Sequence, residues 1–144
     1  ERVHWWCGFA VGVTGLLSGA LVITANGWMN APEGFRWVDG QAVDIDPIDA
    51  MFNAAAATEV LHMLLASFEA TGFAVAGLHA LLLLRGGGTE LRSFHRKALT
   101  ISFVFAAVAA LLQPIAGDLA AKNVAQRQPE KLAAMEGHFR TELG

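Results

Sequence analysis

Cysteine is nearly absent from this chain, because Cys7 is the single one among 144 residues, and this excludes a framework of disulfides within the chain. Charge is also scarce: Asp, Glu, Lys and Arg make up only 16% of the residues and gather between apolar runs. No internal repeat or low-complexity tract is visible beyond the alanines of 54–57. The chain opens without a methionine or a signal peptide and closes without an obvious stop, so we expect a piece of a longer polypeptide.

Apolar residues dominate what is present. They make up 54% of the chain, above the roughly 45–50% of ordinary soluble domains, and the mean hydropathy is +0.43. Three apolar segments, at about 5–29, 52–84 and 98–121, each reach the roughly 20 residues that a membrane span needs. We therefore predict an all-α integral membrane bundle with three transmembrane helices and a short extramembrane C-terminal helix. Residues 1–144 are expected to form a single membrane segment of a larger subunit.

The two links between these segments differ in charge. The link over 30–50 carries five acidic residues against Arg36, whereas the link over 85–97 carries four basic residues against Glu90. By the positive-inside rule the loop 85–97 is predicted to be cytoplasmic. The loop 30–50 and the C-terminal residues 122–144 then lie on the opposite face of the membrane.

His62 lies in the first third of the second apolar segment, where an intramembrane histidine suggests a function. The small residues of 54–57 precede it and Ala66 follows one turn later, so a flat porphyrin could approach its imidazole. The alternative is a packing histidine that hydrogen-bonds to a neighbouring helix. His79 falls roughly 25 Å further along the same helix, where we expect an interfacial role. The remaining histidines are expected to be solvated or at the surface: His4, His95 and His138.

Several polar residues interrupt the apolar segments. Ser18 and Asn26 lie within about 80° of one helical face and could line a proton path, with hydrogen bonding between helices as the alternative. Glu59 precedes His62 by one turn and could touch a haem edge or a proton exit. Asp118 is predicted where the third segment leaves the membrane, and it could simply cap the segment that follows.

The segment from 128 to 136 is short, polar and predicted to be helical, because Pro129 suits the first turn of a helix. Lys131 falls in that first turn, where the helix dipole disfavours a cation, and Glu136 follows five residues later. A quinol needs a cation or hydrogen-bond donor at one oxygen and a base for its hydroxyl proton, so this pair could bind one. The alternative is a solvated amphipathic helix at the membrane surface.

Three motifs in order carry a resemblance to a known family. Residues 25–35, Ala-Asn-Gly-Trp-Met-Asn-Ala-Pro-Glu-Gly-Phe, resemble the Asn-x-Trp-Met-Gln-x-Pro-x-Gly-Phe motif in subunit I of cytochrome bd-type quinol oxidases. Gly117-Asp118 with the Gln-Pro-x-Lys-Leu-Ala-Ala-Met-Glu of 128–136 resembles the entry into that subunit's quinol-binding Q-loop. His62 falls between them, where the family has an axial ligand of its low-spin haem b. The resemblance covers essentially the whole chain and implies the fourth to sixth helices of subunit I.

The resemblance implies a bacterial inner-membrane enzyme that couples the oxidation of ubiquinol or menaquinol to the reduction of dioxygen to water. The family uses a low-spin haem b, a high-spin haem b and haem d. By position, His62 would ligate the low-spin haem iron with Glu59 beside it. The other roles carried over are quinol binding by Lys131 and Glu136, the start of the Q-loop at Asp118, and a polar route at Ser18 and Asn26.

Two positions depart from the family pattern: Asn30 stands where the family often has Gln, and Glu33 where it often has a small apolar residue. The methionine partner of the histidine and the ligands of the high-spin haems are not among these residues. We therefore expect the rest of subunit I, subunit II, a small accessory subunit, quinol and membrane lipid as partners, and no nucleic acid. The alternatives are a bd-like electron-transfer subunit that does not reduce oxygen, and a non-catalytic membrane scaffold.

Overall fold

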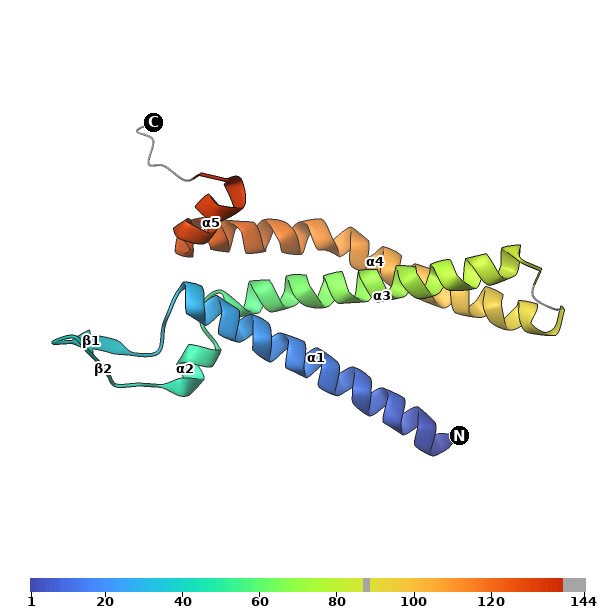
Figure 1. The fold of residues 1–144 in the computed structure, drawn as a ribbon, viewed down its shortest axis with the longest axis horizontal. Coiled ribbons are helices and arrows are strands. Elements are labelled where there is room, and N and C mark those ends of the chain that lie inside the picture. Colours follow the sequence, from blue (N-terminus) through green and yellow to red (C-terminus); the bar gives the residue numbers. More distant parts are fainter. Residues whose placement is uncertain (87–88, 139–144) are drawn as a thin grey trace. The chain divides into compact units, whose positions relative to one another are not determined.

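The computed structural model of the chain describes residues 1–86 and 89–138, so residues 87–88 of the predicted cytoplasmic loop and 139–144 of the predicted Q-loop start lie outside the described residues. Among those described, three helices are long and apolar enough to cross a membrane (Figure 1). They are α1 (Arg2–Asn30), α3 (Ala56–Leu84) and α4 (Thr89–Arg127), and the short helix α5 (Pro129–Glu136) follows them. The predicted all-α membrane fold is confirmed.

The third long helix extends beyond the apolar segment that predicted it. The apolar segment covers about 98–121, whereas α4 begins at Thr89 and ends at Arg127. Hydropathy marks only the part of a helix that suits lipid, and the polar ends of α4 continue because residues such as Ala, Leu, Lys and Arg favour helix. Asp118 therefore lies inside α4 and not at the end of the helix, and its place at the membrane boundary stays a prediction.

Between α1 and α3 the chain forms small elements that hydropathy did not predict. Strands β1 (Arg36–Val38) and β2 (Gln41–Val43) pair antiparallel around Asp39 and Gly40, whose φ angles are 50° and 79°. An Asp-Gly pair with both φ angles positive is the favoured two-residue hairpin turn, because its twist matches that of the strands. Helix α2 (Pro47–Met51) follows, capped by the carboxylate of its N-cap aspartate. The link is thus ordered and gives the end of α1 a defined path to the start of α3.

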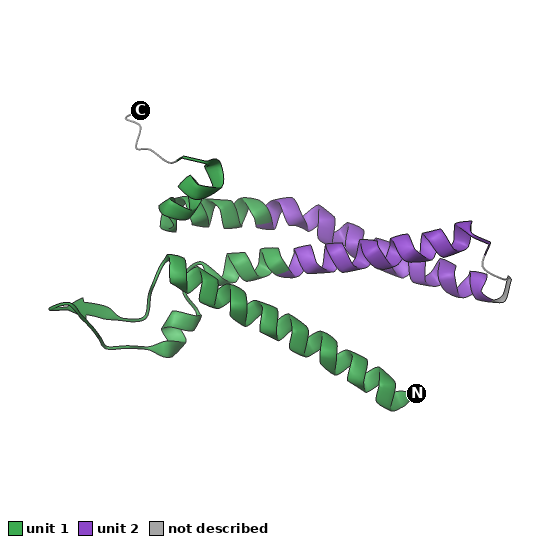
Figure 2. Cartoon of the chain, viewed as in Figure 1, with its two compact units in different colours: residues 1–63, 117–144 green, residues 64–116 purple. Residues whose placement is uncertain are grey.

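The chain divides into two compact units, and α3 and α4 each contribute to both (Figure 2). Unit 1 is Glu1–Met63 with Gly117–Gly144, and unit 2 is Leu64–Ala116. In unit 2 the two helices approach closely at Gly72, where an added Cβ would lie 2.7 Å from the Cβ of Ala106. Small residues thus let the two helices pack closely here.

Unit 1 contains the whole of α1, whose most apolar window has none of its residues buried. Large apolar side chains along it stay exposed, with Val11 71% and Leu17 59% accessible. Contiguous apolar surface of this extent is not stable against water, so lipid or other membrane helices must cover it. The same unit holds the polar side chains that form the candidate site.

Candidate functional site

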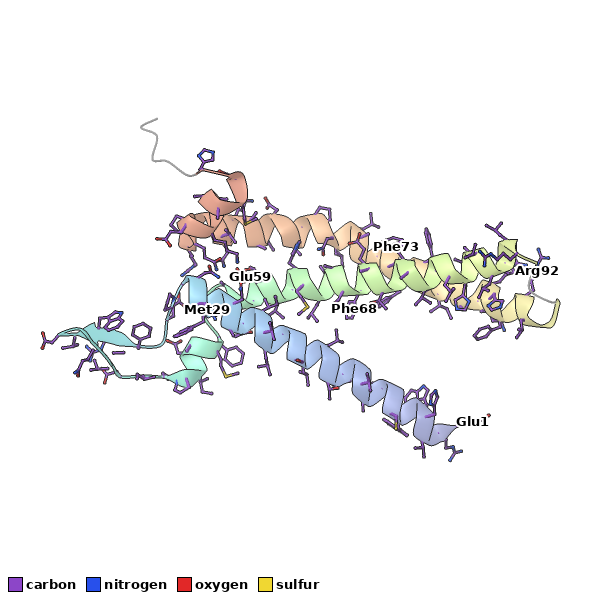
Figure 3. All side chains as sticks on the ribbon, viewed as in Figure 1. Glu1, Met29, Glu59, Phe68, Phe73 and Arg92 are labelled. Atoms are coloured by element: carbon purple, nitrogen blue, oxygen red, sulfur yellow. The ribbon has the colours of Figure 1, made fainter. Side chains whose placement is uncertain are left out.

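A polar cluster forms where the first turn of α3 meets the corner between α4 and α5. The carboxylate Oε1 of Glu59 accepts from Nζ of Lys131 at 3.1 Å and from Nε2 of Gln128 at 3.0 Å. The side chains of Glu59 and Lys131 are only 10% and 28% exposed, and Gln128 as a residue is 2% exposed. Figure 3 labels Glu59 near the N-terminal end of α3. Water cannot fully solvate either partner of this shielded ion pair. The attraction between the two charges and their hydrogen bonds therefore stabilises it.

The corner that presents Lys131 is set by local sequence. The N–H of Gln128 still donates to Val124 of α4, and the carbonyl of Gln128 accepts from Leu132 in the first turn of α5. Pro129 occupies the first position of α5, where its missing N–H costs nothing. Lys131 therefore sits in the first helical turn, against the helix dipole, and the carboxylate of Glu59 offsets that unfavourable position.

Two asparagines form hydrogen bonds at the start of α3. Asn53 is 3% exposed, and its Oδ1 accepts from the backbone N–H groups of Ala55 and Ala56 while its Nδ2 donates to the Thr24 carbonyl of α1. This side chain both caps α3 and joins it to α1. Sequence reasoning missed Asn53, although an Asn just before a helical pattern is a recognised start signal.

Asn123 ties the second half of unit 1 to the same place, because its Nδ2 donates to the Ala54 carbonyl at 2.8 Å. Its Oδ1 and the Oε1 of Gln128 are buried without a hydrogen-bond partner among the described residues. Buried acceptors are rarely left unpaired in proteins. Each would take a hydrogen bond from water, from a substrate or from a further part of the protein.

His62 lies one turn beyond Glu59 on α3 and is half-buried. A Cβ added at Gly117 of α4 would lie 3.4 Å from its Cε1 and 3.6 Å from its Nδ1, which is ordinary van der Waals contact. α4 therefore passes close to that edge of the imidazole ring, and a small side chain would still fit at Gly117. His62, the predicted haem ligand, and Glu59, which contacts Lys131, therefore lie on neighbouring turns of α3.

The structure does not bring the other predicted residues into this cluster. Glu136 is exposed and forms no hydrogen bond or ion pair with any of the residues that the structure describes. Asp118 pairs with Lys122 at 2.6 Å on the exposed side of α4. Ser18 and Asn26 are exposed on α1, where Asn26 accepts from Asn30 through its backbone carbonyl. Lys131 thus meets Glu59 in this structure and not Glu136.

Two further histidines meet in unit 2. The Nδ1 atoms of His79 and His95 lie 2.9 Å apart, and both rings pack edge-on against Phe94. The expectation that His95 is solvated is therefore wrong, because α4 begins well before the apolar segment and carries this histidine back alongside α3. In the described residues no group of three or more His, Cys, Asp or Glu could hold a metal ion.

Three helices that are long and apolar enough to cross a membrane indicate a polytopic helical membrane protein. Residues 1–144 match the family model of cytochrome bd terminal oxidase subunit I. The chain is 34% identical over 130 residues to the cytochrome bd-II ubiquinol oxidase subunit 1 of Escherichia coli (strain K12), covering 88% of this chain. It is 26% identical over 137 residues, 95% of this chain, to the cytochrome bd ubiquinol oxidase subunit 1 of Bacillus subtilis (strain 168).

Among solved structures, the bd oxidase from Geobacillus thermodenitrificans matches 96% of this chain with a TM-score of 0.77 and 37% sequence identity. The chain belongs to the cytochrome bd terminal oxidase subunit I family. It spans 24% and 29% of the two relatives' lengths and 32% of the solved chain. The resemblance read from the three sequence motifs is thereby confirmed.

Proposed function

We propose that this chain is the part of a terminal quinol oxidase that binds and oxidises quinol and ligates a low-spin haem b. The observation that carries the proposal is the shielded cluster of Glu59, Gln128 and Lys131, one helical turn from His62. A cation and an acid beside a possible metal ligand supply what quinol oxidation needs: a donor for one oxygen, a proton acceptor and a nearby electron acceptor.

His62 would hold the haem iron through its imidazole, with Glu59 beside the haem. The residue fits this role, because an imidazole nitrogen is a common ligand of haem iron and α4 passes close to one edge of the ring at Gly117. Haem bound there supplies a centre that accepts one electron at a time. The family resemblance assigns a methionine as the partner of this histidine, and that methionine would come from another part of subunit I.

Lys131 would donate a hydrogen bond to one quinol oxygen, with its charge held by Glu59 in the absence of substrate. Oxidation of a quinol to a quinone releases two protons and two electrons, so a base must stand near each departing proton. Glu59 is the acid already in contact with the lysine, and Glu136 is exposed on the same short helix. We assign Glu136 to the second proton and Asp118 to the start of the Q-loop.

The remaining steps would use residues outside this chain. Ser18 and Asn26 lie on the exposed surface of α1, where another helix of the subunit could complete a polar route. The high-spin haem b and haem d that reduce oxygen to water would be held by the rest of subunit I, working with subunit II. On the charge distribution of the loops, α5 lies on the periplasmic side and the loop between α3 and α4 on the cytoplasmic side of the inner membrane.

The proposal is tested by quinol kinetics of the intact oxidase carrying Lys131→Ala. Loss of one charge-assisted hydrogen bond, about 1.5 kcal/mol, is expected to raise the KM for quinol roughly tenfold. Lys122→Ala is the matched control, because it removes a lysine whose side chain is 66% exposed and pairs with Asp118. Glu136→Ala is expected to lower turnover at unchanged haem content. Equal kinetics in the Lys131 and Lys122 variants would contradict the proposal.

A further inference from the structure

One acidic residue in the loop after α1 contacts three separate segments of unit 1, two through its side chain and one through its backbone carbonyl. Oε1 of Glu33 pairs with Nη1 of Arg127 at 3.1 Å, and its Oε2 accepts from the backbone N–H of Ala54 at 2.9 Å. The backbone carbonyl of Glu33 accepts from Nε1 of Trp28 at 2.9 Å. Glu33 thus links the end of α1, the approach to α3 and the end of α4.

Arg127 has a particular place in the chain, because it is the last residue of α4 and Gln128 follows directly. Gln128 is the buried corner residue that donates to Glu59, and Lys131 is three residues further on. The backbone between Arg127 and Lys131 is too short to absorb a shift of the arginine without moving the lysine. The ion pair between Glu33 and Arg127 is therefore coupled through the backbone to the polar cluster of Glu59, Gln128 and Lys131.

The partial exposure of this ion pair decides what it can do. The side chains of Glu33 and Arg127 are 37% and 47% exposed, and ion pairs of this kind add little to overall stability. The second oxygen of Glu33, however, is fixed by a backbone N–H, so the carboxylate has a defined direction. An anchored carboxylate restricts where the arginine lies even where it adds little free energy.

We propose that Glu33 is a positioning residue for quinol binding: through Arg127 it fixes the corner between α4 and α5, and so holds Lys131 against Glu59. This inference rests on the proposed function of the cluster.

The test compares Glu33→Gln, Arg127→Gln and the double variant in the intact oxidase. Each single variant is expected to raise the KM for quinol about three- to tenfold. The value of kcat at saturating quinol and the low-spin haem spectrum should stay unchanged, because the cluster is displaced but complete. The double variant should raise KM no further than one single variant, since both remove the same contact. Arg127→Lys should restore most of the wild-type KM.

Arg36→Gln is the matched control, because Arg36 forms an exposed ion pair with Asp44 in the same loop and touches nothing in the cluster. Its KM should equal that of the wild type. Unchanged KM in both Glu33→Gln and Arg127→Gln, with a raised KM in Lys131→Ala, would overturn the inference and leave the proposed function standing. If Lys131→Ala also has no effect, the proposed function itself fails.

A parallel loss of haem or of thermal stability in the Glu33 variant would also overturn the inference, because it would indicate a purely structural role. If Glu33→Gln does not assemble, Arg127→Gln decides, since it leaves the hydrogen bond to Ala54 intact.

Discussion

Different kinds of contact stabilise the inside of each of the two units, although α3 and α4 run through both. In unit 2 the helices meet through small side chains, with Ala106 0% and Ala76 4% exposed, and through aromatic pairs such as Phe68 and Phe105 with ring centroids 5.2 Å apart. In unit 1 the most buried polar residues are Asn53 and Gln128, and hydrogen bonds to them join the segments. The helices of unit 2 pack mainly through apolar side chains, beside the contact of His79 with His95, whereas the segments of unit 1 are joined by polar contacts.

This difference distinguishes unit 2, which provides structural support, from unit 1, which contains the candidate site. Close packing of small residues tolerates no added volume and requires no ligand. Buried amides and a shielded ion pair are costly unless every group is satisfied, so they are retained where they serve a function. Substitutions in unit 2 should therefore reduce stability without altering quinol kinetics, whereas substitutions of the ion pair between Glu59 and Lys131 in unit 1 should alter both.

The largest effect is expected at Gly72 of unit 2. A Cβ there would lie 2.7 Å from the Cβ of Ala106, so Gly72→Leu should destabilise the assembled protein by about 3 kcal/mol or more. Thermal unfolding of the purified oxidase in detergent measures this. Gly77→Leu is the control, because an added Cβ at Gly77 meets nothing within 4 Å. Similar melting temperatures for the two variants would contradict the packing account.

A smaller effect is expected for Asn53→Ala in unit 1. The change removes the cap of α3 and its link to the Thr24 carbonyl, so we expect a loss of about 2 kcal/mol. The same thermal measurement applies, with Asn30→Ala as the control because Asn30 is exposed. A fall in stability equal to that of the control would show that the buried amide is not needed.

Glu59→Gln should cost about 1–2 kcal/mol, because it leaves the partly buried ammonium of Lys131 without a counter-charge. Unlike the two changes above, it should also raise the KM for quinol. Glu130→Gln is the matched control, since Glu130 is an exposed acid in the first turn of α5. A Glu59 variant with altered stability and unchanged KM would restrict the acid to a structural role.

The smallest effect is expected for Lys122→Ala. Its ion pair with Asp118 is exposed on both sides, so the stability should change by less than about 0.5 kcal/mol. A larger loss, or a change in turnover, would mean that the ion pair of Lys122 with Asp118 contributes to the site.

The sequence predicted the three long helices and the short C-terminal helix because lipid imposes a length and hydropathy that are local properties of the chain. It did not predict the hairpin over Arg36–Val43, although Asp39-Gly40 is a recognisable turn signal. It placed the end of the third helix too early, since polar residues beyond an apolar run can still be helical. Hydropathy alone does not fix helix ends.

The sequence indicated which residues form the candidate site better than it indicated which of them contact each other. Lys131, Glu59 and His62 were all selected from the sequence, but Lys131 was paired with Glu136 on the same short helix. The structure pairs it with Glu59, which is 72 residues away in the chain. Such a contact depends on how α4 and α5 return to the start of α3, and no local pattern encodes that path.

The central claim is that the histidine one turn from the polar cluster ligates the low-spin haem. The most direct measurement is the reduced-minus-oxidised visible spectrum of the intact oxidase carrying His62→Ala, compared with His79→Ala on the same helix. We expect the low-spin haem b signal to be lost in the His62 variant and retained in the His79 variant. An unchanged low-spin signal in assembled His62→Ala enzyme would contradict it.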